Sequence, residues 1–380
     1  MKQLITLVYL LSSLLLSQWL AAATLPTPTP PPVSARSYIV MDYNSSKILA
    51  EKKADKRVEP ASITKLMTAY VLFTEIKASR IQLSDQVLIS KRARRMTGSR
   101  SFIEAGSRVS VDDLLRGMII QSGNDATVAL AEHAAGSEET FVSLMNQHAA
   151  QLGMTGSNFV NSTGLPDKQH YSTARDIAVL ARALIREFPE FYPLYSEKKF
   201  TYNNITQHNR NLLLWRDSSV DGLKTGHTQS AGYCLVSSAL RDNMRLITVV
   251  LGDKSENKRA VSSLALLNYG FRFFETRKLY AAGQSLKQIR VWKGDKEQLS
   301  VGLNRDLYLT LPRGSFKSLK VSVKLPSQQM APVSKGQSLG TLNVSRDTLV
   351  LAEQPLIALS NVNEGGLWTR ITDSVMLWFE

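Results

Sequence analysis

Hydrophobic and polar residues follow different periods in successive parts of the chain. Residues 37–55 alternate on both sides of a polar turn at 44–47, which predicts a β-hairpin. From residue 62 to residue 187 the apolar positions recur at helical spacing, most clearly in 111–136 and 173–188. The chain therefore begins its folded part with strands and continues into a long helical region.

Strand patterns return after the helical region. The segments 198–204, 231–240 and 244–253 read as strands, and the last two flank the turn "RDN". A helix is predicted next, at about 257–275. A sheet built from both ends of a segment and covered by a helical insert is typical of one α+β domain, which we assign to residues 37–282.

The remainder of the chain has a third pattern. Short alternating runs between Leu286 and Asn361, broken by Gly, Pro and Asp, predict a small all-β domain, assigned to residues 283–365. Residues 366–380 follow a glycine pair and form one apolar helical stripe, made of Leu367, Trp368, Ile371, Val375 and Trp378. We predict an amphipathic helix that lies on a membrane surface, and packing against the β domain is the alternative.

The N-terminus carries a targeting pattern. Residues 1–23 contain one early cation, an apolar stretch from Leu4 to Leu20 and three small residues, which predicts a cleaved signal peptide; an uncleaved anchor is the alternative. Residues 24–36 form a proline-rich spacer without a core of its own. We therefore expect an exported protein.

Composition narrows the possible partners. The 380 residues are 43% hydrophobic and 21% charged, with a formal net charge of +14. A charge of this size favours an anionic neighbour. Because export removes nucleic acid as the main partner, a phospholipid surface or a wall polymer remains. The single cysteine, Cys234, cannot form an internal disulfide and is predicted to be a small buried hydrophobe.

One short motif points to chemistry. Ser62 and Lys65 lie three residues apart at the start of an apolar helical run, so they would share one helix face. This S-x-x-K spacing alone is weak evidence for an active site, since it also occurs at Ser196–Lys199 and Ser255–Lys258.

Two further motifs follow in order. "QSGNDA" places Ser122 and Asn124 in a predicted helical stretch, and "DGLKTGHT" places Lys224 to His227 just before the strand pair. The combination of S-x-x-K, a serine and asparagine two apart, and K-T-G is found in penicillin-binding proteins and class A β-lactamases, here with S-G-N in the middle.

On these motifs the chain resembles the low-molecular-mass, penicillin-binding protein 5-like D-alanyl-D-alanine carboxypeptidases of the serine type, from Ser37 to the C-terminus. The resemblance implies a β-lactamase/transpeptidase-like α+β domain (an antiparallel sheet with a helical insert), followed by a small all-β domain and a C-terminal amphipathic helix. It implies that peptidoglycan stem peptides ending in D-Ala–D-Ala are substrates and that β-lactam antibiotics acylate the enzyme. It also associates Arg210 and Arg259 with the site for the substrate's terminal carboxylate.

Physical chemistry suggests a role for each motif residue. Ser62 needs a base, and Lys65 can act as one only if burial and a nearby cation, for which we expect Lys224, keep it neutral. We expect Ser122 to relay a proton to the leaving amine and Asn124 to orient Lys65 and the substrate. Lys224 and Thr225 would hold a carboxylate.

The third motif also contributes backbone groups. Gly226 would allow the substrate backbone to approach. The backbone N–H groups of Ser62 and His227 would form an oxyanion hole.

No cofactor or metal is predicted, because the five histidines have no metal-ligand spacing. A β-lactamase, a cross-link endopeptidase and a non-catalytic wall-binding protein remain alternatives. The expected location is the periplasmic face of the bacterial inner membrane, with peripheral attachment.

Overall fold

The computed structural model describes residues 27–379, so the predicted signal peptide at 1–23 and the first residues of the spacer lie outside the described part. The chain divides into two compact units, which we describe separately. The larger unit comprises residues 30–284 and 302–310, and the smaller unit contains residues 285–301 and 311–380.

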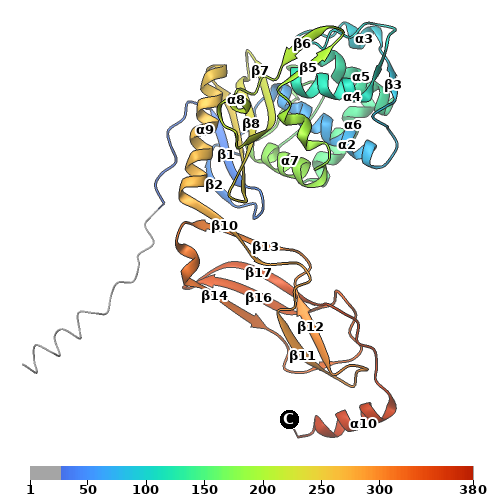
Figure 1. Ribbon diagram of the computed structural model, residues 1–380, viewed down its shortest axis with the longest axis vertical. Helices are drawn as coiled ribbons and strands as arrows, with labels where there is room; N and C mark the ends of the chain where they lie inside the picture. The colour runs from blue at the N-terminus through green and yellow to red at the C-terminus, as the bar shows by residue number, and fades with distance from the viewer. Residues whose placement is uncertain (1–26, 380) are drawn as a thin grey trace, which may run out of the picture. The chain divides into compact units, whose positions relative to one another are not determined.

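The larger unit is built on a five-stranded antiparallel sheet with the order β2-β1-β9-β8-β7 (Figure 1). Its strands are β1 (Ser37–Asp42), β2 (Ile48–Lys52), β7 (Val220–Thr228), β8 (Gly232–Arg241) and β9 (Met244–Asp253). The predicted hairpin of residues 37–55 is the β1–β2 pair, and the predicted hairpin of 231–253 is the β8–β9 pair. Strand β7 forms one edge of the sheet.

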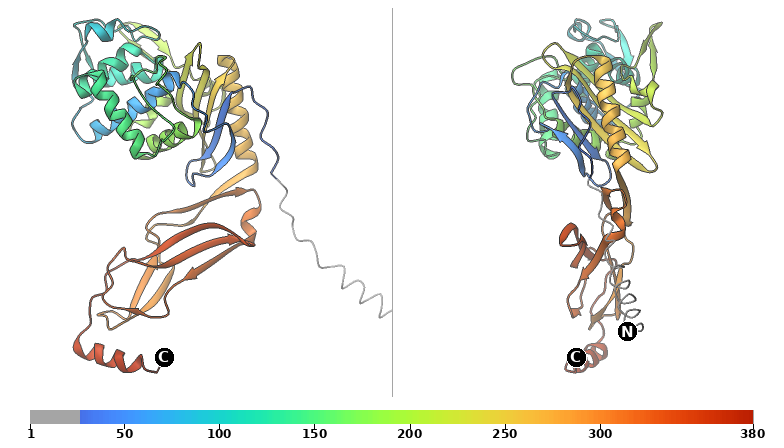
Figure 2. Two further views of the ribbon diagram at one scale, coloured as in Figure 1. Left: turned by 180° about the vertical axis from the view of Figure 1, so that it is seen from behind. Right: turned by 90° about the vertical axis from the view of Figure 1, so that its left-hand side faces the viewer.

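Both faces of the central strands are buried, which explains their nearly continuous apolar sequence. In β1, Ile39 and Met41 join the core on one face, and Tyr38 and Val40 join a second core on the other. Helix α9 (Glu256–Phe273) packs on β8 and β9 and covers the second face, and the remaining long helices cover the first (Figure 2).

The helical insert connects β2 to β7 and holds the largest core. Its helical elements are η1 (Ala61–Thr64), α2 (Lys65–Lys77), α3 (Lys91–Arg94), α4 (Val111–Arg116), η2 (Gly117–Gln121), α5 (Asn124–Ala135), α6 (Glu138–Gln151), α7 (Ala174–Glu187), η3 (Tyr192–Ser196) and α8 (Leu213–Arg216). Helix α7 begins at an N-cap, in which the Thr173 side chain accepts a hydrogen bond from the Asp176 N–H. Helix α9 begins the same way at Ser255, so that S-x-x-K match is a helix cap.

Short strand pairs complete the larger unit. They are β3 (Gln86–Leu88) with β4 (Arg108–Ser110), β5 (Lys199–Tyr202) with β6 (Ile205–His208), and β10 (Phe274–Tyr280) with β13 (Leu307–Pro312).

The smaller unit is an all-β sheet with the order β14-β16-β17-β12-β11-β15. Its elements are β11 (Lys287–Trp292), β12 (Gln298–Gly302), η4 (Ser315–Ser318), β14 (Leu319–Lys324), β15 (Gln329–Met330), β16 (Ser338–Arg346) and β17 (Leu349–Ala358). The predicted fold class, an α+β domain followed by a small all-β domain, is confirmed.

Helix α10 (Leu367–Met376) ends the described chain. Asp373, on its polar side, accepts a hydrogen bond from the Lys293 N–H of the same unit. The apolar stripe faces outward instead, with Trp368 80% and Trp378 90% exposed, so it does not pack on the β unit. Within residues 27–379, no helix combines the length and the apolar character that a bilayer-crossing segment requires.

Candidate active site

The two residues of the first motif meet as predicted. Ser62 lies in the short turn η1, and Lys65 is the first residue of α2. The Lys65 Nζ lies 3.1 Å from the Ser62 Oγ. Its other contacts are Asn124 Oδ1 at 2.7 Å and the Thr163 carbonyl oxygen at 2.8 Å. Lys65 is only 1% exposed, so it is a buried amine and not a surface cation.

Burial lowers the pKa of Lys65 to about 7, with a further contribution from the positive charge of Arg210. The carboxylate of Asp125 acts in the opposite direction. Arg210 thus joins Lys224, the cation that we expected beside Lys65. The charge of Lys65 is one cause of the lowered Lys224 pKa, and repulsion between two amines acts on both of them. An amine with a pKa near 7 is partly neutral at physiological pH and can accept a proton.

The third motif lies on β7, at the edge of the sheet. Lys224 is buried and donates to the Thr225 carbonyl oxygen at 3.2 Å. Burial, together with the positive charges of Lys65, Arg210 and Arg259, lowers the Lys224 pKa well below its ordinary value. A cluster of cations this close together favours an anionic ligand that would relieve their repulsion.

Gly226 brings β7 against the turn that carries Ser62. A Cβ atom at this position would lie 3.1 Å from both the Ile63 nitrogen and the Pro60 oxygen. Contacts this tight leave little room for a side chain. We predicted Gly226 for close approach of the substrate, and the structure adds close approach of two parts of the protein itself.

The second motif does not continue a helix as predicted. Ser122 has left-handed backbone angles, φ 69° and ψ 32°, between η2 and α5. This break turns Ser122 into the site, and its Oγ is buried without a hydrogen-bond partner among residues 27–379. The middle glycine of S-G-N, Gly123, is required because a Cβ there would lie 2.2 Å from the Ser101 Oγ.

Asn124 links the buried lysine to the loop of residues 97–101. Its Nδ2 donates to the Thr97 carbonyl oxygen at 2.6 Å, and its backbone N–H donates to the Ser99 carbonyl oxygen at 2.7 Å. Because the Nδ2 donates its hydrogen bond to Thr97, the Oδ1 must be the atom that faces Lys65. The side chain is thereby fixed in one orientation.

A cavity of about 380 Å³ opens at these motifs. Its lining comprises Ser62, Gly98, Ser99, Ser122, Arg210, Thr225, Gly226, His227, Tyr233, Glu256 and Arg259. Seven of the ten predicted site residues are in this set. The other three, Lys65, Asn124 and Lys224, are buried and do not line the cavity.

The two predicted arginines approach each other at the cavity. Arg259 is 2% exposed, and its guanidinium lies 3.4 Å from the backbone oxygens of Gly226 and Arg210. Glu256 lies 3.8 Å from the same guanidinium. Arg210 and Arg259 both line the cavity and give its wall positive charge.

The sequence analysis missed four cavity residues: Gly98, Ser99, Tyr233 and Glu256. Tyr233 could have been found from the β7–β8 pairing, because it is the register partner of His227 and their ring centroids lie 4.0 Å apart. The loop residues Gly98 and Ser99 carry no comparable signal. Within residues 27–379, no group of three or more His, Cys, Asp or Glu side chains is arranged to hold a metal ion.

Cys234 lies outside this chemistry. It is fully buried, and burial raises the pKa of its thiol to about 11. The prediction of a small buried hydrophobe is confirmed.

Comparison with known proteins places this arrangement in a family. Residues 24–255 match the family model described as D-alanyl-D-alanine carboxypeptidase, Peptidase_S11, and residues 274–364 match the C-terminal domain of penicillin-binding protein 5. The D-alanyl-D-alanine carboxypeptidase DacC of Escherichia coli is 46% identical over 358 residues, covering 92% of this chain and 89% of that protein.

Solved structures agree. Penicillin-binding protein 5 from Haemophilus influenzae superposes with a TM-score of 0.84 at 43% identity, covering 89% of this chain and all of that one. Penicillin-binding protein D2 from Listeria monocytogenes, in its ampicillin-bound form, superposes with a TM-score of 0.60 at 30% identity, covering 64% of this chain and all of that one. The motif geometry, the two matched domains and the similarity along most of the chain agree: this chain belongs to the D-alanyl-D-alanine carboxypeptidase family, Peptidase_S11.

Proposed function

We propose that this chain is a serine carboxypeptidase that removes the terminal D-alanine from peptidoglycan stem peptides ending in D-Ala–D-Ala. The observation that carries the proposal is the 3.1 Å contact between the Ser62 hydroxyl and a buried lysine amine at the wall of a cationic cavity. A serine hydroxyl becomes a nucleophile when an adjacent base takes its proton.

The first chemical step is acylation. Lys65 accepts the Ser62 proton, and Ser62 Oγ attacks the carbonyl carbon of the D-Ala–D-Ala bond. The backbone N–H groups of Ser62 and His227 act as the oxyanion hole, a contribution typically worth about 3–4 kcal/mol of barrier. The proton that Lys65 has taken passes through Ser122, whose hydroxyl has no protein partner among residues 27–379, to the nitrogen of the departing D-alanine. Water then hydrolyses the acyl-enzyme.

Specificity for a chain end comes from the cationic part of the cavity. Arg210, Arg259 and Lys224 supply positive charge, and Thr225 supplies a hydroxyl, so a terminal carboxylate is the fitting ligand. A cross-link whose acceptor is a diamino acid can also place a carboxylate next to the scissile bond, so the substrate comparison below separates the carboxypeptidase from the endopeptidase alternative.

β-Lactams carry a carboxylate and a strained amide, so they fit the same cavity and acylate the same serine. The ampicillin-bound form of the Listeria relative supports this assignment. A β-lactamase would also need a base for rapid deacylation. Glu187 does not line the cavity, and its carboxylate accepts a hydrogen bond from the Tyr70 hydroxyl at 2.6 Å.

The C-terminal helix is the proposed membrane contact. Its apolar stripe is exposed while Asp373 ties its polar side to the β unit, an arrangement suited to lying in a headgroup layer. Together with the signal-like residues 1–23, it supports a peripheral protein on the periplasmic face of the inner membrane. We assign the catalytic function to residues 37–282. We assign to the β domain, residues 283–365, the role of carrying the C-terminal helix.

Release of D-alanine tests the proposed reaction. The protein without residues 1–23 should release D-alanine from a peptide ending in D-Ala–D-Ala and leave the amidated peptide intact. Cleavage of a purified cross-linked dimer at a rate equal to that of the pentapeptide would favour the endopeptidase instead. No release from either substrate would favour a non-catalytic wall-binding protein.

A further inference from the structure

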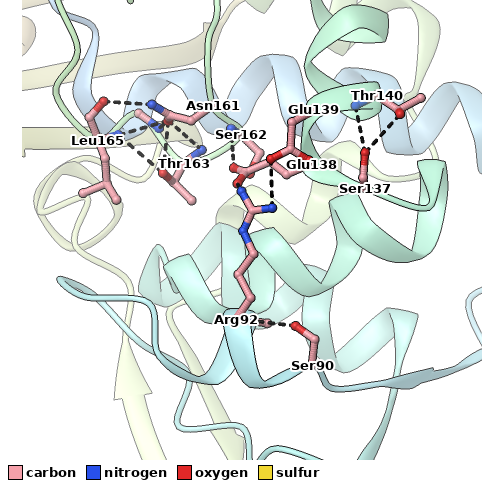
Figure 3. Close-up of polar contacts among 12 residues, drawn as sticks. Ser90, Arg92, Ser137, Glu138, Glu139, Thr140, Asn161, Ser162, Thr163 and Leu165 are labelled. Atoms are coloured by element: carbon pink, nitrogen blue, oxygen red, sulfur yellow. Dashed lines mark hydrogen bonds and ion pairs between the residues drawn. The ribbon is translucent and has the colours of Figure 1, made fainter.

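Glu138 is a buried carboxylate that the reaction described above does not use. It is the first residue of α6 and is 6% exposed. Its Oε1 accepts hydrogen bonds from the Ser162 N–H at 2.9 Å and from the Ser162 Oγ at 2.6 Å. Its Oε2 pairs with the Arg92 guanidinium at 2.6 Å, so Glu138 lies between α3 and the loop that contains Ser162 (Figure 3).

The loop of residues 161–165 is held at three further points. Within it, Asn161 Oδ1 accepts hydrogen bonds from the backbone N–H groups of Thr163, Gly164 and Leu165 (Figure 3). The Ser162 carbonyl oxygen accepts from Thr68 Oγ1 at 2.6 Å. Gly164, with φ +83°, lies so close to η1 that a Cβ would overlap the Ala61 oxygen at 1.9 Å. The loop is therefore a defined part of the wall behind Ser62.

This loop supplies one of the contacts of the catalytic amine. The Thr163 carbonyl oxygen accepts from Lys65 Nζ at 2.8 Å, and Asn124 Oδ1 accepts from it at 2.7 Å. A neutral amine has two N–H donors and one lone pair. The Asn124 and Thr163 oxygens can only accept hydrogen bonds, so together they use both N–H groups of the amine. The lone pair then faces the Ser62 hydroxyl, whose oxygen lies 3.1 Å from the nitrogen. The two carbonyl oxygens thus decide where the base points.

We propose that Glu138 is a positioning residue for acylation: through Ser162 it holds the Thr163 carbonyl at Lys65, so that the amine's lone pair is directed at Ser62. This inference rests on the proposed function of Lys65 as the base. Arg92 completes the arrangement, because a carboxylate this deeply buried needs a charge partner. Through Arg92, the basic segment of residues 91–95 contributes to this arrangement.

The chain offers a matched control. Glu139 is the next residue and pairs with the same Arg92 at 2.9 Å, but its side chain is 71% exposed. No hydrogen bond joins it to residues 161–165 in the described part of the chain. Glu138→Ala and Glu139→Ala therefore both weaken the Arg92 pairing, and only the first releases the loop.

The experiment compares both variants with the unaltered protein. We would measure kcat and KM for D-alanine release, and the rate of acylation by a fluorescent penicillin from pH 5 to pH 9. Glu138→Ala should lower kcat and acylation by about 10-fold to 100-fold, because misplacing a catalytic group by about 1 Å can cost this much. KM should stay within about 2-fold, since neither Glu138 nor Ser162 lines the cavity. Glu139→Ala should leave all of these values unchanged.

The pH profile separates positioning from loosened packing. Lys65 faces Arg210, Lys224 and Asp125 as well as the two carbonyl oxygens. A carbonyl acceptor favours the ammonium form, so losing it lowers the pKa of Lys65, and the rising limb of the acylation profile should move to lower pH. A limb displaced to higher pH would mean that water had reached the amine and would overturn the proposal.

Two further variants guard against unfolding of Glu138→Ala. Glu138→Gln keeps an oxygen that can accept from Ser162, and Ser162→Ala removes only the hydroxyl hydrogen bond. Both should retain the melting temperature within a few degrees and show intermediate losses of kcat. Unchanged kcat in both, or a loss confined to KM, would reject the positioning role. An inactive unaltered protein would instead reject the proposed function.

Discussion

Gly226 on strand β7 lies directly against the backbone of Ile63, the residue that follows the proposed nucleophile Ser62: a methyl group on Gly226 would come 3.1 Å from the Ile63 nitrogen. This closeness couples the sheet edge to the turn η1. The two backbone N–H groups of the proposed oxyanion hole, at Ser62 and at His227, keep their spacing only while these two segments stay in contact. The spacing of these two segments is therefore a property that one substitution can test.

Gly226→Ala should push β7 away from η1. We expect acylation by a fluorescent penicillin to slow by about 10-fold or more. Overpacking of this kind should lower the free energy of unfolding by about 1–3 kcal/mol. Gly366→Ala is the control, because a Cβ at Gly366 meets no atom within 4 Å. Acylation rates are measured by quenching the labelling reaction at successive times. Equal rates for the two variants would contradict the coupling between β7 and η1.

Ser62→Ala should abolish both D-alanine release and covalent labelling by penicillin, since no hydroxyl remains to be acylated. Ser196→Ala provides a control at another S-x-x-K match; its hydroxyl donates to the Pro193 carbonyl oxygen at the protein surface. Gel fluorescence and mass spectrometry of the adduct measure the outcome. Persistent labelling of Ser62→Ala would move the nucleophile to another residue.

Acylation should depend on pH through Lys65. Its pKa is lowered from an ordinary value of 10.5 to about 7, and the neutral form is the base. The rate should therefore be low at pH 5, rise through about pH 7 and level off above it. Lys65→Arg, which stays protonated, should be inactive at every pH. A flat profile between pH 5 and pH 9 would argue against Lys65 as the base.

Arg210 should control the position of that pH limb. Its positive charge lowers the pKa of Lys65, so Arg210→Gln should let this pKa rise and shift the limb to higher pH. Arg259→Gln is the matched comparison, because Arg259 lowers the pKa of Lys224, whereas Arg210 lowers the pKa of both Lys224 and Lys65. Both substitutions should raise KM for a peptide with a free carboxylate. A limb that moves equally in both variants would refute the separate role of Arg210.

Deleting residues 366–380 should release the protein from membranes and leave D-alanine release unchanged. Trp368 and Trp378 are among the most exposed apolar side chains of the stripe, so changing both to Ser should weaken attachment in the same direction. Flotation with vesicles of phosphatidylethanolamine and phosphatidylglycerol measures the effect. Full retention of the deletion variant on vesicles would assign membrane attachment to another part of the chain.

The sequence by itself determined the strand and helix order, the two-part organisation and the motif residues around Ser62, Ser122 and Lys224. Those features follow from local periodicity and from short spacings such as Ser62 to Lys65, where one helical turn fixes the geometry. The S-x-x-K match at Ser255 proved to be a helix cap, which shares its spacing with the first motif.

Only the tertiary structure decided how charges and polar groups from distant segments meet. Arg210, which the sequence analysis associated only with the substrate's carboxylate, proved to lower the pKa of Lys65 as well, because Coulomb energy depends on distance in space and not along the chain. The left-handed break at Ser122 lies between η2 and α5, and the adjacent Gly123 lies against Ser101 of another segment. The link from Arg92 through Glu138 to Thr163 joins segments about 70 residues apart, and no local pattern encodes such a contact.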